Sequence, residues 1–282
     1  MKNKAANIDG LSQISQYYDL FIFDLWGVVH DGITPFQHSV DTIKKLKALG
    51  KTVLILSNSP KRIGDTAAHL SMMGISKELY DGMYTSGQDC YDRLCWRDHP
   101  WYQALGKHFF HIGPARNESI FTEIGYYSIQ DPSDADFVLC SGTDGWCTTL
   151  DPFYNVLKIC MAWNLPMVCA NQDLCITREG KEYMCVGAIS KHYEKMGGNV
   201  FYHGKPSPDM FERLFTFNAI RGPKHKTIMV GDSLLTDIAG ANTFGIDSVF
   251  ITSGIHWKEC VNEQTLSRFN AFPTWVTDHC SW

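Results

Sequence analysis

The stretch that decides the fold is "YDLFIFDLWGVVHDG", from Tyr18 to Gly32. A run of apolar residues begins at Leu20 and ends abruptly on the carboxylate of Asp24. Short apolar runs of this kind are typical of a strand buried in a sheet, and we expect this one to extend over residues 20–29. A buried strand that carries an aspartate at its tip usually does so for chemistry. Trp26 stands two residues further on, so the bulkiest apolar side chain follows the candidate catalytic group.

The overall composition is that of a soluble globular protein. The chain has 282 residues, 44% of them hydrophobic and 20% charged, which is enough for one large domain or two moderate ones. The net charge of -5 and the absence of a Lys/Arg run argue against nucleic acid as a partner. No apolar run approaches the roughly 18 residues of a membrane span, and the N-terminus is too polar for a signal peptide. We therefore expect a cytoplasmic protein without a membrane partner.

The ten cysteines do not form a recognisable framework. They are scattered, and no two of them stand in a C-x-x-C pair. This spacing fits neither a structural zinc site nor a small disulfide-bonded domain. We expect them to be reduced and mostly buried.

Strands and helices alternate in the first part of the chain. Val40, Ile43, Leu46 and Leu49 recur at helical spacing before Gly50, which predicts an amphipathic helix. The stretch "KTVLILSNS" then reads as a second buried strand, and "RIGDTAAHLSMMG" as a second helix. A β-α-β-α order of this kind predicts a parallel sheet with helices on its faces.

The last part of the chain repeats the pattern, with the segments 209–220, 227–233, 234–245 and 247–254 predicted as helix, strand, helix and strand. The middle holds further strand candidates, "ADFVLCS" and "PMVCAN", but has less regular periodicity. We predict a Rossmann-like three-layer α/β/α core from residues 1–82 and 202–282. A second α/β domain, residues 83–201, is expected to be inserted into that core.

Polar residues follow the predicted core strands at their carboxyl ends. Asp24 follows the first strand, Ser57 and Asn58 end the second, and Asp232 ends the strand "TIMVGDS". Ligands of open parallel sheets bind at this edge. Asp237 lies five residues beyond Asp232, where a helix N-terminus would favour it in any case. The segment "GKPSPDMF" also brings Lys205 to the start of a helix.

Four motifs, taken together and in this order, resemble those of the haloacid dehalogenase (HAD) superfamily. "FIFDLWG" is similar to the first, with Asp24 as nucleophile, and "LILSNS" to the second, with Ser57 as phosphate ligand. "GKPSPDMF" resembles the third, with Lys205, and "VGDSLLTDIAGANTFG" the fourth, with Asp232 and Asp237. The insertion between the second and third motifs resembles the class IIA members, which have a large α/β cap. Phosphatases of p-nitrophenyl phosphate, pyridoxal phosphate, phosphoglycolate, nucleotides and sugar phosphates belong to that class.

The resemblance implies a Mg²⁺-dependent phosphatase of a small phosphorylated metabolite. By this analogy a carboxylate oxygen of Asp24, the backbone carbonyl of Trp26 and Asp232 hold the metal ion, and Asp237 supports them. Ser57, Asn58 and Lys205 would bind the phosphoryl group. Asp24 would attack phosphorus and form an aspartyl-phosphate, which water then hydrolyses. Mg²⁺ and Mn²⁺ are not distinguished by these residues.

Trp26 departs from the family pattern. Phosphatases of this family usually carry a second aspartate there, which protonates the leaving group and is worth about 10²–10⁴ in rate. Three interpretations stay open: another group supplies the proton or none is needed, the chain cleaves a C–P or C–halogen bond, or it binds a phosphorylated ligand with weakened turnover. Asp31, or His30, is a candidate substitute acid on the flap beside the site. Asp31 before Gly32 is also an ordinary turn residue.

Substrate contacts are expected from the inserted domain. The stretch "ANQDLCITREG" resembles an N-x-D segment of the class IIA caps, with Asn171 and Asp173 as candidate substrate ligands; an Asx-type turn is the alternative. Thr143, Asp144 and Trp146 are further candidates for the pocket lining. Caps of this type often dimerise, so a homodimer through the cap is a further expectation.

Overall fold

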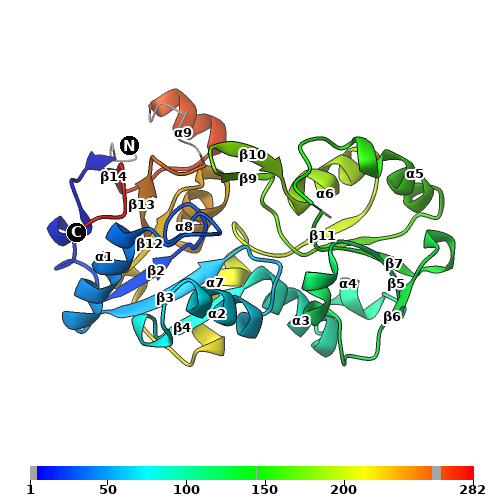
Figure 1. Cartoon of the computed structure of the whole chain (residues 1–282), viewed down its shortest axis with the longest axis horizontal. Coiled ribbons are helices and arrows are strands. Elements are labelled where there is room, and N and C mark those ends of the chain that lie inside the picture. The colour runs from blue at the N-terminus through cyan, green and yellow to red at the C-terminus, as the bar shows by residue number, and fades with distance from the viewer. Residues whose placement is uncertain (1–4, 144, 256–261) are drawn as a thin grey trace.

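The computed structural model describes residues 5–143, 145–255 and 262–282. Figure 1 shows two units side by side, each built on its own parallel sheet. The chain passes between them twice, once after β4 (Gly82–Thr85) and once after β11 (Val200–Tyr202). The expected α/β architecture is confirmed. No helix in the described ranges is both long and apolar enough to cross a membrane.

The first sheet, the core sheet, has seven strands, and all of its neighbouring strands run parallel. Strand β2 (Leu20–Phe23) pairs with a late strand on one side and an early strand on the other, so both ends of the chain build one sheet. In spatial order the strands are β1 (Ala6–Asn7), β14 (Trp275–Thr277), β13 (Asp247–Ile251), β12 (Thr227–Gly231), β2 (Leu20–Phe23), β3 (Thr52–Ser57) and β4.

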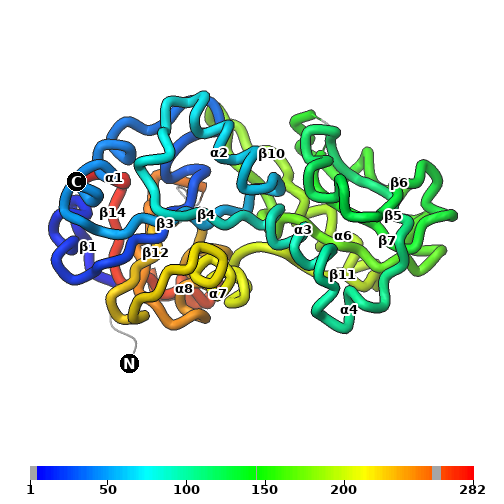
Figure 2. Tube along the Cα trace, turned by 90° about the horizontal axis from the view of Figure 1, so that it is seen from below, coloured from blue at the N-terminus to red at the C-terminus, as the bar shows by residue number. Residues whose placement is uncertain are grey.

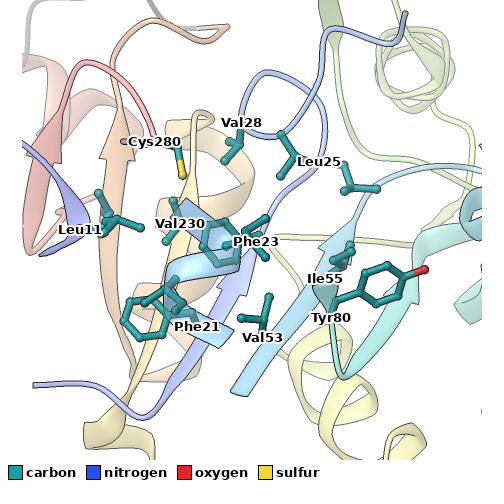
Figure 3. Close-up of a cluster of buried hydrophobic side chains, with 14 of the residues drawn as sticks. Leu11, Phe21, Phe23, Leu25, Val28, Val53, Ile55, Tyr80, Val230 and Cys280 are labelled. Carbon is teal, nitrogen blue, oxygen red and sulfur yellow. The ribbon is translucent and has the colours of Figure 1, made fainter. Parts of the chain in front are cut away.

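Alternate residues of the central strands enter two separate cores. Phe21 and Phe23 of β2 pack with Val53 and Val230 on one face, as Figure 3 shows, whereas Ile22 faces the opposite core. Strands that are buried on both faces in this way read as continuous apolar runs. The covering helices are α1 (Gln37–Ala48), α2 (Ile63–Met72), α7 (Pro208–Phe217), α8 (Ala239–Phe244) and α9 (Glu263–Phe269), with the short turns η1 (Leu11–Gln13), η2 (Lys77–Leu79), η6 (Lys224–Lys226) and η7 (Leu234–Ile238).

The second sheet, the inserted sheet, has five parallel strands in the order β11, β8, β7, β5 and β6. Figure 2 shows this unit beside the core, joined to it through α3 (Ser86–Trp96) and the segment that leads to α7. Its other elements are β5 (His108–Ile112), β6 (Tyr127–Ile129), β7 (Phe137–Cys140), β8 (Met167–Cys169), α4 (Pro100–Gln103), η3 (Ala115–Ile120), η4 (Pro132–Asp134), η5 (Asp151–Phe153), α5 (Tyr154–Ala162) and α6 (Val186–Lys195).

A two-stranded hairpin extends from the inserted unit toward the core (Figure 1). It consists of β9 (Cys175–Arg178) and β10 (Lys181–Met184), which pair antiparallel. The two residues between them, Glu179 and Gly180, both have positive φ, at 49° and 72°. This is the geometry of a tight hairpin turn whose twist matches that of the strands.

Several elements differ from their predicted extents. The first strand ends at Phe23 instead of running to Val29, because the chain turns back after Asp24: Val29 and His30 both donate to the carbonyl of Leu25. The helix predicted over 234–245 begins with a π-helical turn, η7, before α8. Leu49, expected on the buried face of α1, is 56% exposed beyond the helix end. The boundary expected between residues 82 and 83 falls inside β4.

Five of the cysteines in the described ranges are buried free thiols, namely Cys90, Cys140, Cys160, Cys169 and Cys280. Cys140 and Cys169, for example, are fully buried on neighbouring strands of the inserted sheet. These cysteines therefore behave as small apolar core residues, as the sequence indicated.

Candidate active site

Residues from four distant segments meet at the carboxyl edge of the core sheet. Asp24 follows β2, and Asp232 follows the neighbouring strand β12. Lys205, on the loop before α7, donates from Nζ to Asp24 Oδ1 at 2.5 Å and lies 2.7 Å from Asp237 Oδ1. The same ammonium donates to the carbonyl of Leu56 at 2.8 Å. Lys205 is only 1% exposed, so its charge is fixed against the carboxylates and not shared with bulk water.

The three aspartates form one buried cluster. Oxygen atoms of Asp24, Asp232 and Asp237 all lie within 4.8 Å of one another. Burial raises the pKa of Asp24 although Lys205 opposes the shift, and burial together with the Asp24 charge raises that of Asp232 well above its usual range. Burial likewise raises the pKa of Asp237 to about 6. Three clustered carboxylates against one ammonium leave negative charge uncompensated, and this donor set fits a hard divalent cation such as Mg²⁺.

The backbone closes tightly around Asp232. Gly27 has a φ of +83°, and a Cβ atom there would lie 2.1 Å from Asp232 Oδ2. A Cβ atom on Gly254 would lie 2.1 Å from Asp232 Cβ, and the N–H of Ile255 donates to Asp232 Oδ2 at 2.7 Å. The position of this carboxylate is therefore set by two glycine-bearing turns.

A chain of hydrogen bonds connects the core to the inserted unit beside the cluster. The N–H of Lys205 donates to Asn58 Oδ1 at 2.7 Å, and Asn58 Nδ2 donates to Asp173 Oδ1 at 2.8 Å. Asp173 in turn donates its N–H to Asn171 Oδ1 at 2.7 Å. Asn171 thus forms the Asx-type turn considered above and also faces the cleft. Burial, opposed by Lys205, raises the pKa of Asp173 to about 6.

One cavity of about 710 Å³ lies between the two units and takes in most of the predicted site. Its volume is that of pockets that hold small molecules. Thr143 and Trp146 line it as expected, whereas Asp144 lies outside the described residues. Asp237 contacts Lys205 without reaching the lining. The predicted residues on the cavity wall are Asp24, Trp26, Ser57, Asn58, Asn171, Asp173, Lys205 and Asp232.

Trp26 connects the turn after β2 to the hairpin. Its indole Nε1 donates to the backbone carbonyl of Thr177 on β9 at 2.9 Å. Its ring lies edge-on to His30, with ring centroids 5.7 Å apart, and a Cβ atom on Gly32 would lie 2.1 Å from the indole. The side chain that replaces the usual acid is therefore fixed in a contact between the two units.

The two candidate substitute acids lie in different places. Asp31 Oδ1 accepts from the N–H groups of Ile33 and Thr34, as a turn residue does, and these bonds hold its pKa below the usual value. Asp31 is absent from the wall of the main cavity and lines a smaller one beyond Trp26. His30 does line the main cavity, and burial, followed by the charge of His69, lowers its pKa to about 4.

Several residues on the cavity wall were not predicted from the sequence. Lys61, His69 and Arg116 line it, as does Arg178 of the hairpin. Lys61 could have been suspected, since it follows Ser57 by four residues in the same loop. The Glu179–Gly180 pair between two four-residue segments was an available sign of the hairpin. No comparable sign marks Arg116, because only the folded inserted unit brings it to the cleft.

Two family models match this chain. The model of haloacid dehalogenase-like hydrolases matches residues 21–127, and a second, described as HAD-hydrolase-like, matches residues 202–281. The two matches contain the four candidate residues Asp24, Ser57, Lys205 and Asp232.

Curated relatives and solved structures cover almost the whole chain. A 4-nitrophenylphosphatase of Schizosaccharomyces pombe is 26% identical, across 94% of this chain and 93% of its own length. Ribonucleotide monophosphatase NagD of Escherichia coli is 28% identical, across 90% and 94%. The crystal structure of a haloacid dehalogenase-like hydrolase from Brucella suis superposes with a TM-score of 0.83 at 26% identity, and covers 96% of this chain and 99% of that one.

Proposed function

Because the chain belongs to the haloacid dehalogenase-like hydrolases, and is a phosphomonoesterase of their class with an α/β cap, we propose that it hydrolyses a small phosphorylated metabolite through an aspartyl-phosphate on Asp24. The observation that carries this proposal is the cluster itself. A buried aspartate at a strand tip is held by a buried lysine, beside two further carboxylates and below a cavity of metabolite size.

The side chains suggest how the reaction proceeds. Lys205 holds Oδ1 of Asp24, which leaves Oδ2 to attack phosphorus in line. The new Oδ2–P bond forms as the bond from phosphorus to the ester oxygen breaks, and the leaving oxygen departs as an anion that takes a proton from water. In the second step water attacks phosphorus and gives up a proton to the solvent, the acyl phosphate bond breaks, inorganic phosphate leaves, and Asp24 returns to its carboxylate form. Ser57 and Lys205 would bind the equatorial oxygen atoms of the phosphoryl group.

Asp24, Asp232 and the carbonyl of Trp26 would hold Mg²⁺, and Asp237 would support them through Lys205. The ion would neutralise charge on the phosphoryl group while carboxylate and phosphate approach each other. The carboxylates of the site and the phosphate of the substrate are both anionic and repel each other. A bound cation would reduce this repulsion and allow the substrate to enter. Asn58 and Asp173 would place the substrate from the two sides of the cleft.

We propose that the core, expected as residues 1–82 and 202–282 and completed by the rest of β4, is the catalytic domain, and that the unit inserted after β4 is a cap that selects the substrate and excludes water. A homodimer through the cap and a cytoplasmic location are kept as predictions.

The direct test is turnover of p-nitrophenyl phosphate and acetyl phosphate by the purified protein with Mg²⁺. Asp24→Asn should reduce turnover to the uncatalysed background, and chelation with EDTA should abolish it until Mg²⁺ is restored. Asp134→Asn, an exposed aspartate of the inserted unit, is the matched control and should leave turnover unchanged. Full activity of Asp24→Asn would contradict the proposed nucleophile.

A second candidate, ligand binding with weak turnover, is favoured by one observation. The indole of Trp26 occupies the position of the usual acid and is hydrogen-bonded elsewhere. Binding of phosphorylated ligands without hydrolysis of any phosphate in a broad panel would support this candidate.

A further inference from the structure

Basic side chains line the cavity outside the carboxylate cluster, and one of them, Arg178 of the hairpin, stacks over the ring of Trp146, with its Cζ 4.2 Å from the ring centroid. Three others are Lys61 on the loop between β3 and α2, His69 on α2, and Arg116 on η3 of the inserted unit, so the two units both contribute. Within the described ranges no carboxylate lies within ion-pairing distance of Lys61 or Arg116. Lys205 is paired with Asp24 and Asp237 and belongs to the site proposed for the reacting phosphoryl group.

The three groups lie close enough to affect one another. Burial, and then the guanidinium of Arg116, lower the pKa of Lys61. Burial, and then the ammonium of Lys61, lower the pKa of His69. Because its pKa is lowered, His69 is neutral at pH 7 and can act at this site only as a hydrogen-bonding group. Lys61 and Arg116 are the two cations that repel each other, and a bound anion relieves that repulsion.

The loop that carries Lys61 is rigidly attached to the core. Thr85 Oγ1 donates to the carbonyl of Lys61 at 2.7 Å, and Ser86 Oγ donates to that of Ser59 at 2.9 Å. A Cβ atom on Gly87 would lie 2.5 Å from the Lys61 carbonyl oxygen, so the loop packs directly on the start of α3. Four residues of backbone span at most about 14 Å. Ser57 and Lys61 therefore lie within reach of a single small molecule.

A buried hydroxyl group, that of Thr66, lies near His69 on the wall of the same cavity. Thr66 is 4% exposed, lines the cavity and lies one helical turn before His69 on the same side of α2. Its Oγ1 has no hydrogen-bond partner among the described residues. An unsatisfied buried hydroxyl costs free energy, which an oxygen atom of a ligand, or water ordered by it, would offset.

From these observations we propose that Lys61, His69 and Arg116 form a second anion-binding subsite. The substrate is then a phosphate monoester with a second anionic group, either a carboxylate or another phosphate, bound at this subsite. The inference rests on the proposed function, which places the reacting phosphoryl group at Asp24 and Lys205. A cavity of about 710 Å³ has room for both groups of such a molecule.

The experiment measures binding to Asp24→Asn protein by calorimetry with Mg²⁺, so that it does not depend on turnover. The probes are n-propyl phosphate, O-phospho-3-hydroxypropionate, which adds a carboxylate, and 1,3-propanediol bisphosphate, which adds a phosphate. We expect at least one doubly anionic probe to bind about tenfold more tightly than n-propyl phosphate, because it gains charged hydrogen bonds. Which of the two gains identifies the second group.

Adding Lys61→Met or Arg116→Met should bring that ratio of affinities toward one. Lys158→Met and Arg221→Met, which replace exposed residues away from the cavity wall, should keep it. Equal binding of all three probes, no binding of any probe, or a ratio unaffected by Lys61→Met and Arg116→Met would each overturn the subsite. Failure of the proposed function is a separate result: it would be seen as absence of p-nitrophenyl phosphate turnover by the unmodified protein.

Discussion

At the scale of single residues, Trp26 raises the question of which group protonates the leaving oxygen. The side chain stands where a carboxylic acid is usual and donates its only polar hydrogen to the hairpin. Asp31 is held in a turn, and the neutral His30 next to Trp26 is the titratable neighbour that does reach the cavity. The leaving group then has to depart with little help from an acid at position 26.

The first prediction therefore concerns the leaving group. The unmodified protein should hydrolyse aryl and acyl phosphates far faster than alkyl phosphates, because good leaving groups need no proton. Trp26→Asp should raise kcat for alkyl phosphates by up to about 10²-fold, the lower range for an added acid. Steady-state rates against leaving-group pKa measure this. Trp26→Phe, which adds no acid, is the control, and a flat dependence in the unmodified protein would mean that another acid is present.

The second prediction concerns Asp173, whose pKa burial raises to about 6. A raised pKa means that the folded protein holds this proton at pH values where the unfolded chain has lost it, so folding stability falls as pH rises from about 4 to about 6. Asp173→Asn should therefore raise the melting temperature at pH 7 and have little effect at pH 4. Thermal unfolding in EDTA at both pH values is the measurement. An equal effect at the two values would contradict the assignment.

At the scale of elements, the turn after β2 holds the site together. Gly27 adopts a φ of +83° and lies directly against Asp232, so the turn can form only with a residue that has no side chain.

The third prediction compares two glycines with the same backbone conformation. Gly245→Ala should cost about 1–2 kcal/mol of folding stability, since its φ is +86°. Gly27→Ala, with a φ of +83°, should cost more than that, because its Cβ atom would also lie 2.1 Å from Asp232 Oδ2. Only Gly27→Ala should also weaken Mg²⁺-dependent turnover, because a Cβ atom at residue 245 would meet nothing within 4 Å. Denaturant unfolding and kinetics with a Mg²⁺ titration separate the two effects. Equal losses of activity would show that the contact with Asp232 is unimportant.

The elements differ in how far the sequence predicts them. The central strands were predictable because they are buried on both faces, with Phe21 and Phe23 on one face and Ile22 on the other, and therefore form unbroken apolar runs. The end of β2 was not, since Leu25, Val28 and Val29 are just as buried in the turn that follows. The motifs give Asp24, Ser57, Lys205 and Asp232, which lie at strand ends or in a short loop beside them. The place of Arg116 at the cavity could not be predicted from the sequence. This residue comes from the inserted unit, and no local sequence pattern specifies how the two units approach each other.

At the scale of the whole molecule, the cavity exists because two α/β units face each other. Among the described residues, the side-chain hydrogen bonds that connect them at the cavity include Asn58 with Asp173, Gln172 with the carbonyl of Gly204, and Trp26 with Thr177. Each is a hydrogen bond, and such bonds are easily exchanged for bonds to water when the units separate.

The fourth prediction follows for motion of the hairpin. Trp26→Phe removes the indole donor and should speed amide hydrogen exchange in residues 175–184, whereas the amides of β13 should be unaffected. Mg²⁺ with inorganic phosphate should slow exchange in the same segment of the unmodified protein. Mass spectrometry of peptic fragments can measure both. Unchanged exchange of the hairpin in Trp26→Phe would mean that other contacts hold it in place.

The indole N–H of Trp26 donates to a main-chain oxygen of β9, and this affects how the sequence of the hairpin can evolve. Every amino acid at position 177 offers the same acceptor, so the hairpin can drift in sequence and alter the substrates that it admits while its attachment persists. The reverse does not hold. A change of Trp26 to a residue without an N–H donor removes this hydrogen bond in one step, so selection on this link acts on one partner alone.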